Sequence, residues 1–198
     1  MCPSRLPMTG DSGGSAPAGA RTKTDGGVSM RIPIRWATAG AMVVAMAVAA
    51  SYFFLTDSPR APRATFSLLS GRTLSTGQLR GKVYLVDFWA TSCATCIAEM
   101  PQMIQTYERF RGKDFDFIAV AMSYDPANYV ADYSRTRHLP FQVALDGSGQ
   151  VARAFYDVRM TPTTFLVDKQ GHVVKRILGR PDFATLDALI RDELARPA

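Results

Sequence analysis

Two cysteines, Cys93 and Cys96, are the residues of this 198-residue chain whose type and spacing most clearly allow chemistry. They lie in the segment VDFWATSCATCIAEMP, residues 86–101. Two thiols at this spacing can bind a metal, form a structural disulfide, or exchange electrons with other thiols and disulfides. A structural disulfide is disfavoured, because so small a closed loop restricts the unfolded chain very little.

A metal site finds few further ligands in the sequence. A structural zinc site needs four ligands, usually from a second cysteine pair or a pair of histidines. Only Cys2, His138 and His172 remain as ligands of those types, and Cys2 lies beyond a long apolar segment. A copper site, with Met160 or His172 joining the cysteines, stays open as an alternative. We expect no resident metal and no cofactor.

The cysteine pair falls where an expected strand ends and an expected helix begins. Residues 82–90, KVYLVDFWA, form a nearly continuous apolar run, which is typical of a strand covered on both faces. After Cys93 the apolar residues recur every three or four positions, which indicates a helix. Because free N–H groups at a helix start stabilise a thiolate, we expect Cys93 to be the nucleophile, with a lowered pKa. Cys96, deeper on the same face, would be the resolving thiol.

The rest of the pattern indicates strands that alternate with helices. Strand-like segments occupy residues 116–122, 163–168 and 172–178, and helix-like segments occupy residues 126–138 and 183–194. Residues 65–81 precede this core as a small hairpin, with turns at Gly71 and Gly77. This order implies parallel strands joined by helices, with an antiparallel edge.

An apolar segment precedes the expected domain. Residues 36–55, WATAGAMVVAMAVAASYFFL, carry no charge and would form a helix of about 30 Å, enough to cross a bilayer. We interpret residues 30–55 as an uncleaved signal-anchor, with aromatic residues at the membrane interface and the N-terminus inside. The alternative is a signal peptide cleaved near Ala47-Val48-Ala49, which would leave a secreted domain.

Composition divides the remainder of the chain. Residues 1–29 are rich in Gly, Ser, Ala and Pro, so we expect them to be disordered. Met30 directly precedes RIPIRW, as a signal-anchor would begin, and we hypothesise that translation starts there and that residues 1–29 are not translated. Residues 56–64 form a Pro/Arg linker, and residues 65–198 form the domain. The net charge is +6, but no basic stripe is interleaved with aromatic residues, so we expect no nucleic-acid partner.

The segment VDFWATSCATCIAEMP, followed by MTPTTFLVD, resembles the thioredoxin superfamily and, within it, the TlpA/ResA/DsbE-type membrane-anchored thiol-disulfide oxidoreductases. The likeness rests on W-x-x-x-C-x-x-C, on Pro101 five residues after the second cysteine, and on a Thr-Pro dipeptide entering a later strand. It implies a thioredoxin-like α/β fold, with a central mixed sheet flanked by helices. The expected fold also includes an N-terminal hairpin extension and, before it, a single N-terminal transmembrane anchor.

The resemblance also implies roles for individual residues. Pro162 matches a cis-proline, which would bare the backbone groups of Thr161 for an extended substrate; the alternative is an ordinary trans proline. Asp87 matches the buried acid of thioredoxins, which would take a proton from Cys96. The alternative for Asp87 is a strand-end acid that reaches solvent.

Three further residues are weighed in the same way. Glu99 matches a glutamate of the ResA-like branch that tunes the acidity of the cysteines and helps recognise substrate; the alternative is a solvated helical acid. Trp89 would cover the cysteine pair and offer a docking surface, although a core aromatic has the same pattern. Ser92 stands where a tryptophan is common, which removes an aromatic from the docking surface and supplies a candidate N-cap.

The function that these observations predict is a thiol-disulfide oxidoreductase that reduces disulfides in client proteins. The resemblance implies a bacterial inner-membrane protein with its catalytic domain in the periplasm, anchored in the bilayer through residues 36–55, and serving cytochrome c maturation or copper-centre assembly. Expected partners are disulfide-containing clients, such as apocytochrome c or copper-site proteins, and a membrane electron donor of the DsbD/CcdA kind. The alternatives are a copper-binding assembly factor and a thiol peroxidase. A peroxidase is disfavoured because Val86 and Ala90 replace its Pro and Thr.

Overall fold

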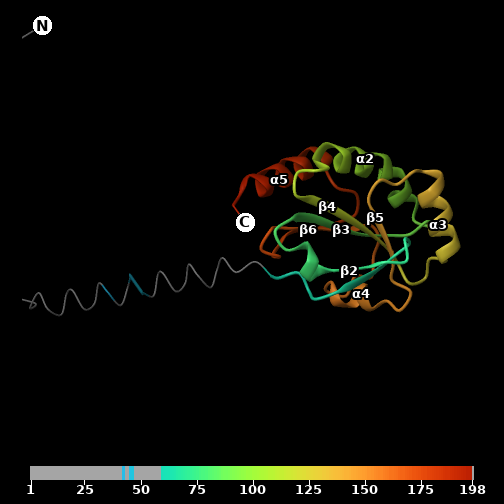
Figure 1. Ribbon diagram of the computed structural model, residues 1–198, viewed down its shortest axis with the longest axis horizontal. Coiled ribbons are helices and arrows are strands. Elements are labelled where there is room, and N and C mark those ends of the chain that lie inside the picture. The colour runs from blue at the N-terminus through green and yellow to red at the C-terminus, as the bar shows by residue number, and fades with distance from the viewer. Residues whose placement is uncertain (1–41, 43–44, 47–58, 198) are drawn as a thin grey trace, which may run out of the picture. The chain divides into compact units, whose positions relative to one another are not determined.

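A seven-stranded mixed sheet with helices on both faces forms the folded part of the chain (Figure 1). The computed structural model describes residues 42, 45–46 and 59–197. The strands are β1 (Thr65–Leu68), β2 (Thr73–Ser75), β3 (Val83–Trp89), β4 (Phe115–Ala121), β5 (Gln142–Leu145), β6 (Thr163–Val167) and β7 (Val173–Leu178). The helices are η1 (Thr76–Leu79), a 3₁₀ turn, and the α-helices α2 (Ala94–Phe110), α3 (Ala127–Thr136), α4 (Gln150–Ala154) and α5 (Phe183–Ala195).

The strand order in the sheet is β2-β1-β5-β4-β3-β6-β7. The three central strands β5, β4 and β3 run parallel, and β6 pairs antiparallel with β3, with Phe88 opposite Thr163. Helices α2 and α3 make the crossovers that parallel neighbours require. The carboxyl ends of β3 and β4 and the amino end of β6 therefore meet at one edge of the sheet, directly before the cysteine pair.

Two hydrophobic layers cover β3, because alternate side chains of a strand point to opposite faces. Leu85 and Trp89 pack against α2, α3 and α5 on one face. Val86 and Phe88 pack on the other face, with side chains of α4 and of the N-terminal hairpin. Figure 1 shows the same layers, with α2 and α5 on one side of the sheet and α4 on the other. Every residue of β3 is buried.

The predicted strands and helices are confirmed within two residues at their ends, and two elements were missed. Strand β5 and helix α4 are four and five residues long, too short to show a clear period. The predicted N-terminal hairpin is present, and because β1 pairs with β5, it adds β1 and β2 to that edge of the sheet. Its turn contains Gly71 as predicted, whereas Gly77 lies in η1 and forms no second hairpin turn.

The predicted membrane anchor falls almost wholly outside the residues that the structure describes. Of residues 30–55, only Met42, Ala45 and Met46 are described, and all three are helical and exposed. In the described part of the chain, no helix is long and apolar enough to span a membrane. Residues 1–29 lie outside the described part, as do residues 56–58 of the linker. The anchor, the start at Met30 and the disorder of residues 1–29 therefore stay predictions.

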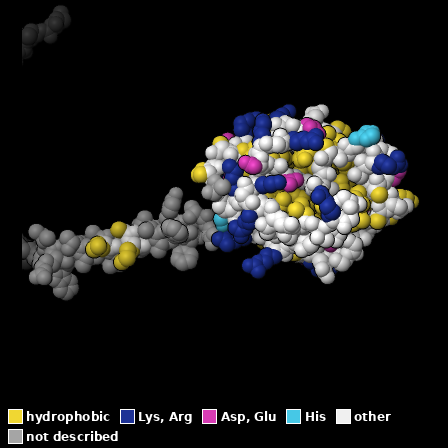
Figure 2. All heavy atoms as spheres, viewed as in Figure 1, with side chains coloured by type: hydrophobic (Ala, Val, Ile, Leu, Met, Phe, Trp, Pro, Cys, Tyr) yellow, Lys and Arg dark blue, Asp and Glu magenta, His cyan; other side chains and the backbone are white. Residues whose placement is uncertain are grey.

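Charge is mixed over the visible surface of the folded unit. Lys and Arg side chains are scattered there among acidic and uncharged ones (Figure 2). On this face, positive charge is not gathered into the continuous stripe that a nucleic-acid groove requires.

A buried carboxylate joins α5 to α2. Asp187 of α5 is 6% exposed and accepts a hydrogen bond from the Thr106 hydroxyl of α2 (2.9 Å). The same carboxylate pairs with Arg109, whose side chain is about half exposed. Because α5 also covers the face of β3 that bears Asp87 and Trp89, this contact helps to keep water away from that face.

We expect Asp187→Ala to lower the free energy of unfolding by about 1–3 kcal/mol, because the buried Thr106 hydroxyl loses its acceptor. Urea unfolding of the oxidised protein measures the change. The control is Asp192→Ala, which removes an exposed carboxylate from the same helix and should leave the midpoint unchanged. Equal midpoints for the two variants would show that the α2–α5 contact contributes nothing.

Candidate functional site: a disulfide at the start of α2

Cys93 and Cys96 form a disulfide, so the structure shows the oxidised state of the pair. Their Cα atoms lie 5.3 Å apart across the first turn of α2. Cys93 is half-buried, whereas Cys96 is completely buried. The predicted division into an accessible and a deep sulfur is confirmed, because a partner can reach only Cys93 from solvent.

Cys93 is itself the N-cap residue of α2. Its Sγ accepts a hydrogen bond from the backbone N–H of Cys96 (3.2 Å), and no acidic residue lies in the first helical turn. After reduction, the same N–H and the positive end of the helix dipole would face a thiolate on Cys93. Ser92 was considered as the N-cap, but the cysteine takes that position.

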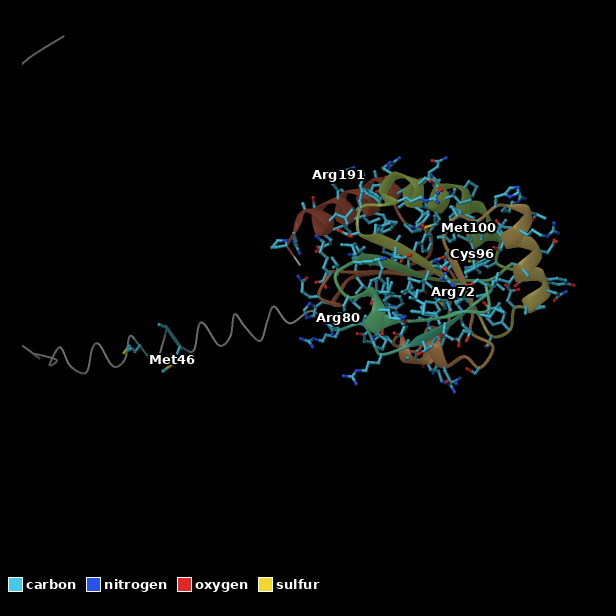
Figure 3. The ribbon with its side chains drawn as sticks, in the orientation of Figure 1. Met46, Arg72, Arg80, Cys96, Met100 and Arg191 are labelled. Carbon is cyan, nitrogen blue, oxygen red and sulfur yellow. A yellow bond between two sulfur atoms is a disulfide. The ribbon has the colours of Figure 1, made fainter. Side chains whose placement is uncertain are left out.

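Cys96 belongs to α2, and its side chain is part of the hydrophobic layer that α2 forms against the sheet. Figure 3 labels Cys96 and Met100, which lie one turn apart in the interior of the fold. Trp89 belongs to the same layer, is 0% exposed, and packs against Tyr133 with ring centroids 5.4 Å apart. Trp89 therefore contributes to the cover over the pair, but the predicted docking role is wrong for this state, because a client cannot touch a fully buried ring.

Asp87 lies on the face of β3 that α2 covers, and it is 1% exposed. The Thr164 hydroxyl of β6 donates a hydrogen bond to Asp87 Oδ1 (2.8 Å). Burial raises the pKa of Asp87 to about 7, although the hydrogen bond from Thr164 opposes the shift. The alternative of a solvent-reaching acid is wrong, because β6 and α2 enclose this part of β3.

Glu99 lies on α2 one turn after Cys96 and is also 1% exposed. Among the described residues, neither of its carboxyl oxygens has a hydrogen-bond partner. Burial raises the pKa of Glu99 to about 8, and repulsion from Asp87 adds to the shift, while Arg180 opposes it. The alternative of a solvated helical acid is wrong. Near neutral pH this side chain is mostly a neutral carboxylic acid.

The Thr161–Pro162 peptide bond is cis, as the resemblance implied. The loop is held from both sides: Pro162 O accepts from the Gly179 N–H (2.9 Å), and the Thr163 hydroxyl donates to Met160 O (2.7 Å). Among the described residues, no hydrogen bond involves the backbone N–H or C=O of Thr161. An extended substrate can therefore pair with those groups without displacing a protein contact.

A third carboxylate, Asp125, which the sequence did not single out, fixes the loop that carries Cys93. Asp125 is 8% exposed and accepts two hydrogen bonds from Thr91, one from its N–H and one from its hydroxyl, both 2.6 Å. In the sequence, an aspartate before Pro126 and a helix looks like an N-cap. The N-cap of α3 is Pro126 instead, and the aspartate turns back toward the end of β3.

The structure separates His172, one of the two residues considered for copper, from the cysteine pair. His172 lies beside the β6–β7 turn, where its ring contacts Asp168 (3.3 Å), next to the residues that pair with the amino end of β3. Cys93 follows the carboxyl end of β3, so the two cannot share an ion. Within residues 59–197, no group of three or more His, Cys, Asp or Glu side chains is arranged to hold a metal.

Comparisons with known proteins agree with this geometry. The Redoxin family matches residues 56–190. The thiol-disulfide oxidoreductase ResA of Bacillus thuringiensis (strain Al Hakam) is 35% identical, over 66% of this chain and 75% of that protein. The ResA protein of Bacillus subtilis (strain 168) is 32% identical, over 63% and 69%. A thiol:disulfide interchange protein of the thioredoxin family from Chlorobium tepidum TLS is 27% identical, with a TM-score of 0.65 over 71% of this chain and 99% of that one.

The fold is thioredoxin-like, and the chain belongs to the Redoxin family. Within that family it is of the TlpA/ResA/DsbE type, and it is a thiol-disulfide oxidoreductase.

We expect Asp125→Ala to loosen the loop before Cys93, because the Thr91 N–H loses its acceptor. Hydrogen–deuterium exchange of the Thr91 amide should become about tenfold faster or more, in line with the usual free energy of a hydrogen bond to a charged group. Asp132→Ala removes an exposed carboxylate of α3 and should leave that amide protected. Unchanged exchange in Asp125→Ala would show that other contacts hold the loop.

The two buried acids make stability depend on pH in a defined direction. Between their ordinary pKa values near 4 and the folded values of about 7 and about 8, the folded protein holds protons that the unfolded chain has lost. The folded state then binds more protons, so its stability is highest at the acidic end of this range. Stability is lost as the pH rises, until both acids are ionised in the folded protein.

For the oxidised protein, we expect the free energy of unfolding to fall by up to about 1.4 kcal/mol per pH unit for each acid between roughly pH 5 and pH 8. Glu99→Gln should make this slope shallower, because an amide does not ionise. Glu108→Gln, an exposed substitution on the same helix, is the control and should keep the slope. Urea unfolding at several pH values measures it, and an identical slope in Glu99→Gln would contradict the assignment.

Proposed function

We propose that this protein reduces disulfides in client proteins through the Cys93/Cys96 dithiol, from a domain held at the outer face of a bacterial inner membrane. One observation carries the proposal: a half-exposed sulfur at a helix start is bonded to a buried sulfur beside two buried acids. A site of this kind can transfer an electron pair and also accept the proton that the deep thiol must lose.

The reaction proceeds in two exchanges. In the reduced protein, the Cys93 thiolate attacks one sulfur of the client disulfide, and the other client sulfur leaves as a thiolate that takes a proton from water. Cys96 then gives its proton to Asp87 and attacks Cys93 Sγ, which breaks the mixed disulfide and releases the second client sulfur as a thiolate that takes up the second proton. The client gains two electrons and two protons in total, and the protein is left with the Cys93–Cys96 disulfide seen in the structure.

The acids divide the proton transfer between them. Asp87 receives a hydrogen bond from Thr164 and ionises first, with a pKa of about 7, so near neutrality it can accept the proton of Cys96. Among the described residues Glu99 has no such partner, and burial raises its pKa to about 8, so it is mostly protonated at neutral pH. Two acids whose environments separate their pKa values in this way can act as a base and an acid in one site.

The location follows from the anchor predicted at residues 30–55, with release to the periplasm after signal cleavage as the alternative. The periplasm is oxidising, so a reductase working there must be reduced again after each cycle. We propose a membrane electron donor of the DsbD/CcdA kind for that step. The clients would be apocytochrome c or copper-site proteins, whose cysteines must be thiols before haem or copper can bind.

We expect Cys93→Ser to reduce the dithiothreitol-driven reduction of insulin to the uncatalysed rate, because the attacking sulfur is lost. Cys96→Ser should instead accumulate mixed disulfides between Cys93 and clients, since nothing resolves them, and mass spectrometry of the trapped species would identify those clients. Glu108→Gln, an exposed substitution on α2, is the control and should behave as the wild type. Full insulin reduction by Cys93→Ser would refute the proposed site.

A further inference from the structure

The loop between β4 and α3 touches both loops that make the site. Asp125 binds Thr91, two residues before Cys93. The neighbouring residue, Tyr124, shares a hydrogen bond between its hydroxyl and the Thr161 hydroxyl (3.3 Å). Residues 123–125 therefore join the cysteine loop to the cis-proline loop, and Tyr124 lies over the residue whose backbone is free.

Two bulky side chains near the backbone of Thr161 are exposed to solvent. Tyr124 is 58% exposed, although its hydroxyl is held by Thr161, and Met160, directly before Thr161, is 60% exposed. Single exposed apolar residues are common on proteins. Here, however, one precedes Thr161 in the chain and the other is hydrogen-bonded to its hydroxyl, and among the described residues the backbone N–H and C=O of Thr161 have no partner. This loop lies at the edge of the sheet where β3 ends, before Cys93. This combination offers main-chain pairing and apolar contact to the same ligand.

The chemistry of the site decides which ligand that is. A molecule that reacts with Cys93 must carry a disulfide, and one that pairs with Thr161 must present an extended main chain. Along an extended segment, alternate side chains point to the same side, so a residue beside the client cysteine comes to face Tyr124 and Met160. A tyrosine ring and a flexible methionine favour an apolar partner and adapt to its shape.

The charged side chains near Tyr124 and Met160 have partners within the protein. Asp125 points inward to Thr91, and Asp157 is paired with Arg159 in the segment before Met160. Arg180, which follows the Gly179 that binds Pro162, donates a hydrogen bond to the side chain of Gln102. Tyr124 and Met160 carry no charge themselves, so apolar contact is the interaction that these two side chains can use to discriminate.

We propose that Tyr124, together with Met160, determines specificity by selecting client segments that carry a bulky apolar residue beside the disulfide cysteine. This inference rests on the proposed disulfide-reductase function and names the class of segment that the site prefers.

The test compares two synthetic peptides that carry the same disulfide and differ only in the residue beside the cysteine, Phe in one and Ser in the other. The measurement is the rate constant at which each peptide oxidises the reduced full-length protein. We expect the wild type to react about five- to tenfold faster with the Phe peptide, which is the upper part of the effect that one aromatic contact provides. Tyr124→Ala should bring this ratio to about one or two.

Two further variants sharpen the comparison. Tyr124→Phe keeps the ring and loses the bond to Thr161, so it should keep most of the preference. Tyr129→Ala removes a tyrosine of similar exposure, 60%, from α3, and it should retain the wild-type ratio. An unchanged urea midpoint for Tyr124→Ala would show that the fold is intact.

Oxidised glutathione serves as a third probe, which separates the two proposals. If the reduced wild type reacts with neither glutathione disulfide nor the peptides, the proposed function itself fails. If it reacts with all three but shows no preference for Phe, or if Tyr124→Ala keeps the preference, only the specificity role is overturned. A loss of preference in Tyr129→Ala would also overturn it, because the effect would not belong to the surface beside Thr161.

Discussion

All seven side chains of β3, from Val83 to Trp89, are buried, because α2, α3 and α5 cover one face of the strand and α4 and the N-terminal hairpin cover the other. A carboxylate on such a strand cannot reach water. Asp87 therefore meets a cost for ionising that a surface aspartate does not meet, and its pKa rises to about 7. The same strand leads into the loop that carries Cys93, so one buried strand positions both the cysteine pair and the acid that we propose as the proton acceptor.

Glu99 is the second acid of the site whose ionisation is limited by burial. A buried carboxyl group without a hydrogen-bond partner lowers the stability of a fold, and natural cores rarely keep one. Near neutral pH the cost is limited, because Glu99 stays protonated and so avoids placing a second negative charge beside Asp87. Stability is thus lost at the place where the proposed reaction would use a group that can exchange protons. This fits the general observation that functional sites retain locally unfavourable groups.

Topology explains why the loops of the site converge. The carboxyl ends of the parallel strands β3 and β4 lie at the same edge of the sheet, so Thr91 and Asp125, which follow those strands, come within hydrogen-bonding distance. Strand β6 runs antiparallel to β3, and its amino end brings the cis-proline loop to that edge. Three loops that are more than thirty positions apart in the chain therefore meet at the edge of the sheet that precedes Cys93.

The sequence alone was sufficient for features that depend on local pattern: the buried strand, the helix that begins at Cys93, the redox pair, and the α/β class with its closing hairpin and helix. It did not determine which face of β3 Asp87 would occupy, or whether Glu99 would be covered, because burial depends on neighbours distant in the chain. The short β5 and α4 have too few residues to establish a period. Asp125 has the sequence context of an N-cap, and its actual partner, Thr91, lies 34 residues away, so nothing in the sequence indicates their contact. For Trp89 the sequence left both a docking surface and a core position open, and the residue lies inside for the same reason: only the packed helices α2, α3 and α5 decide which aromatic residues remain open to a partner.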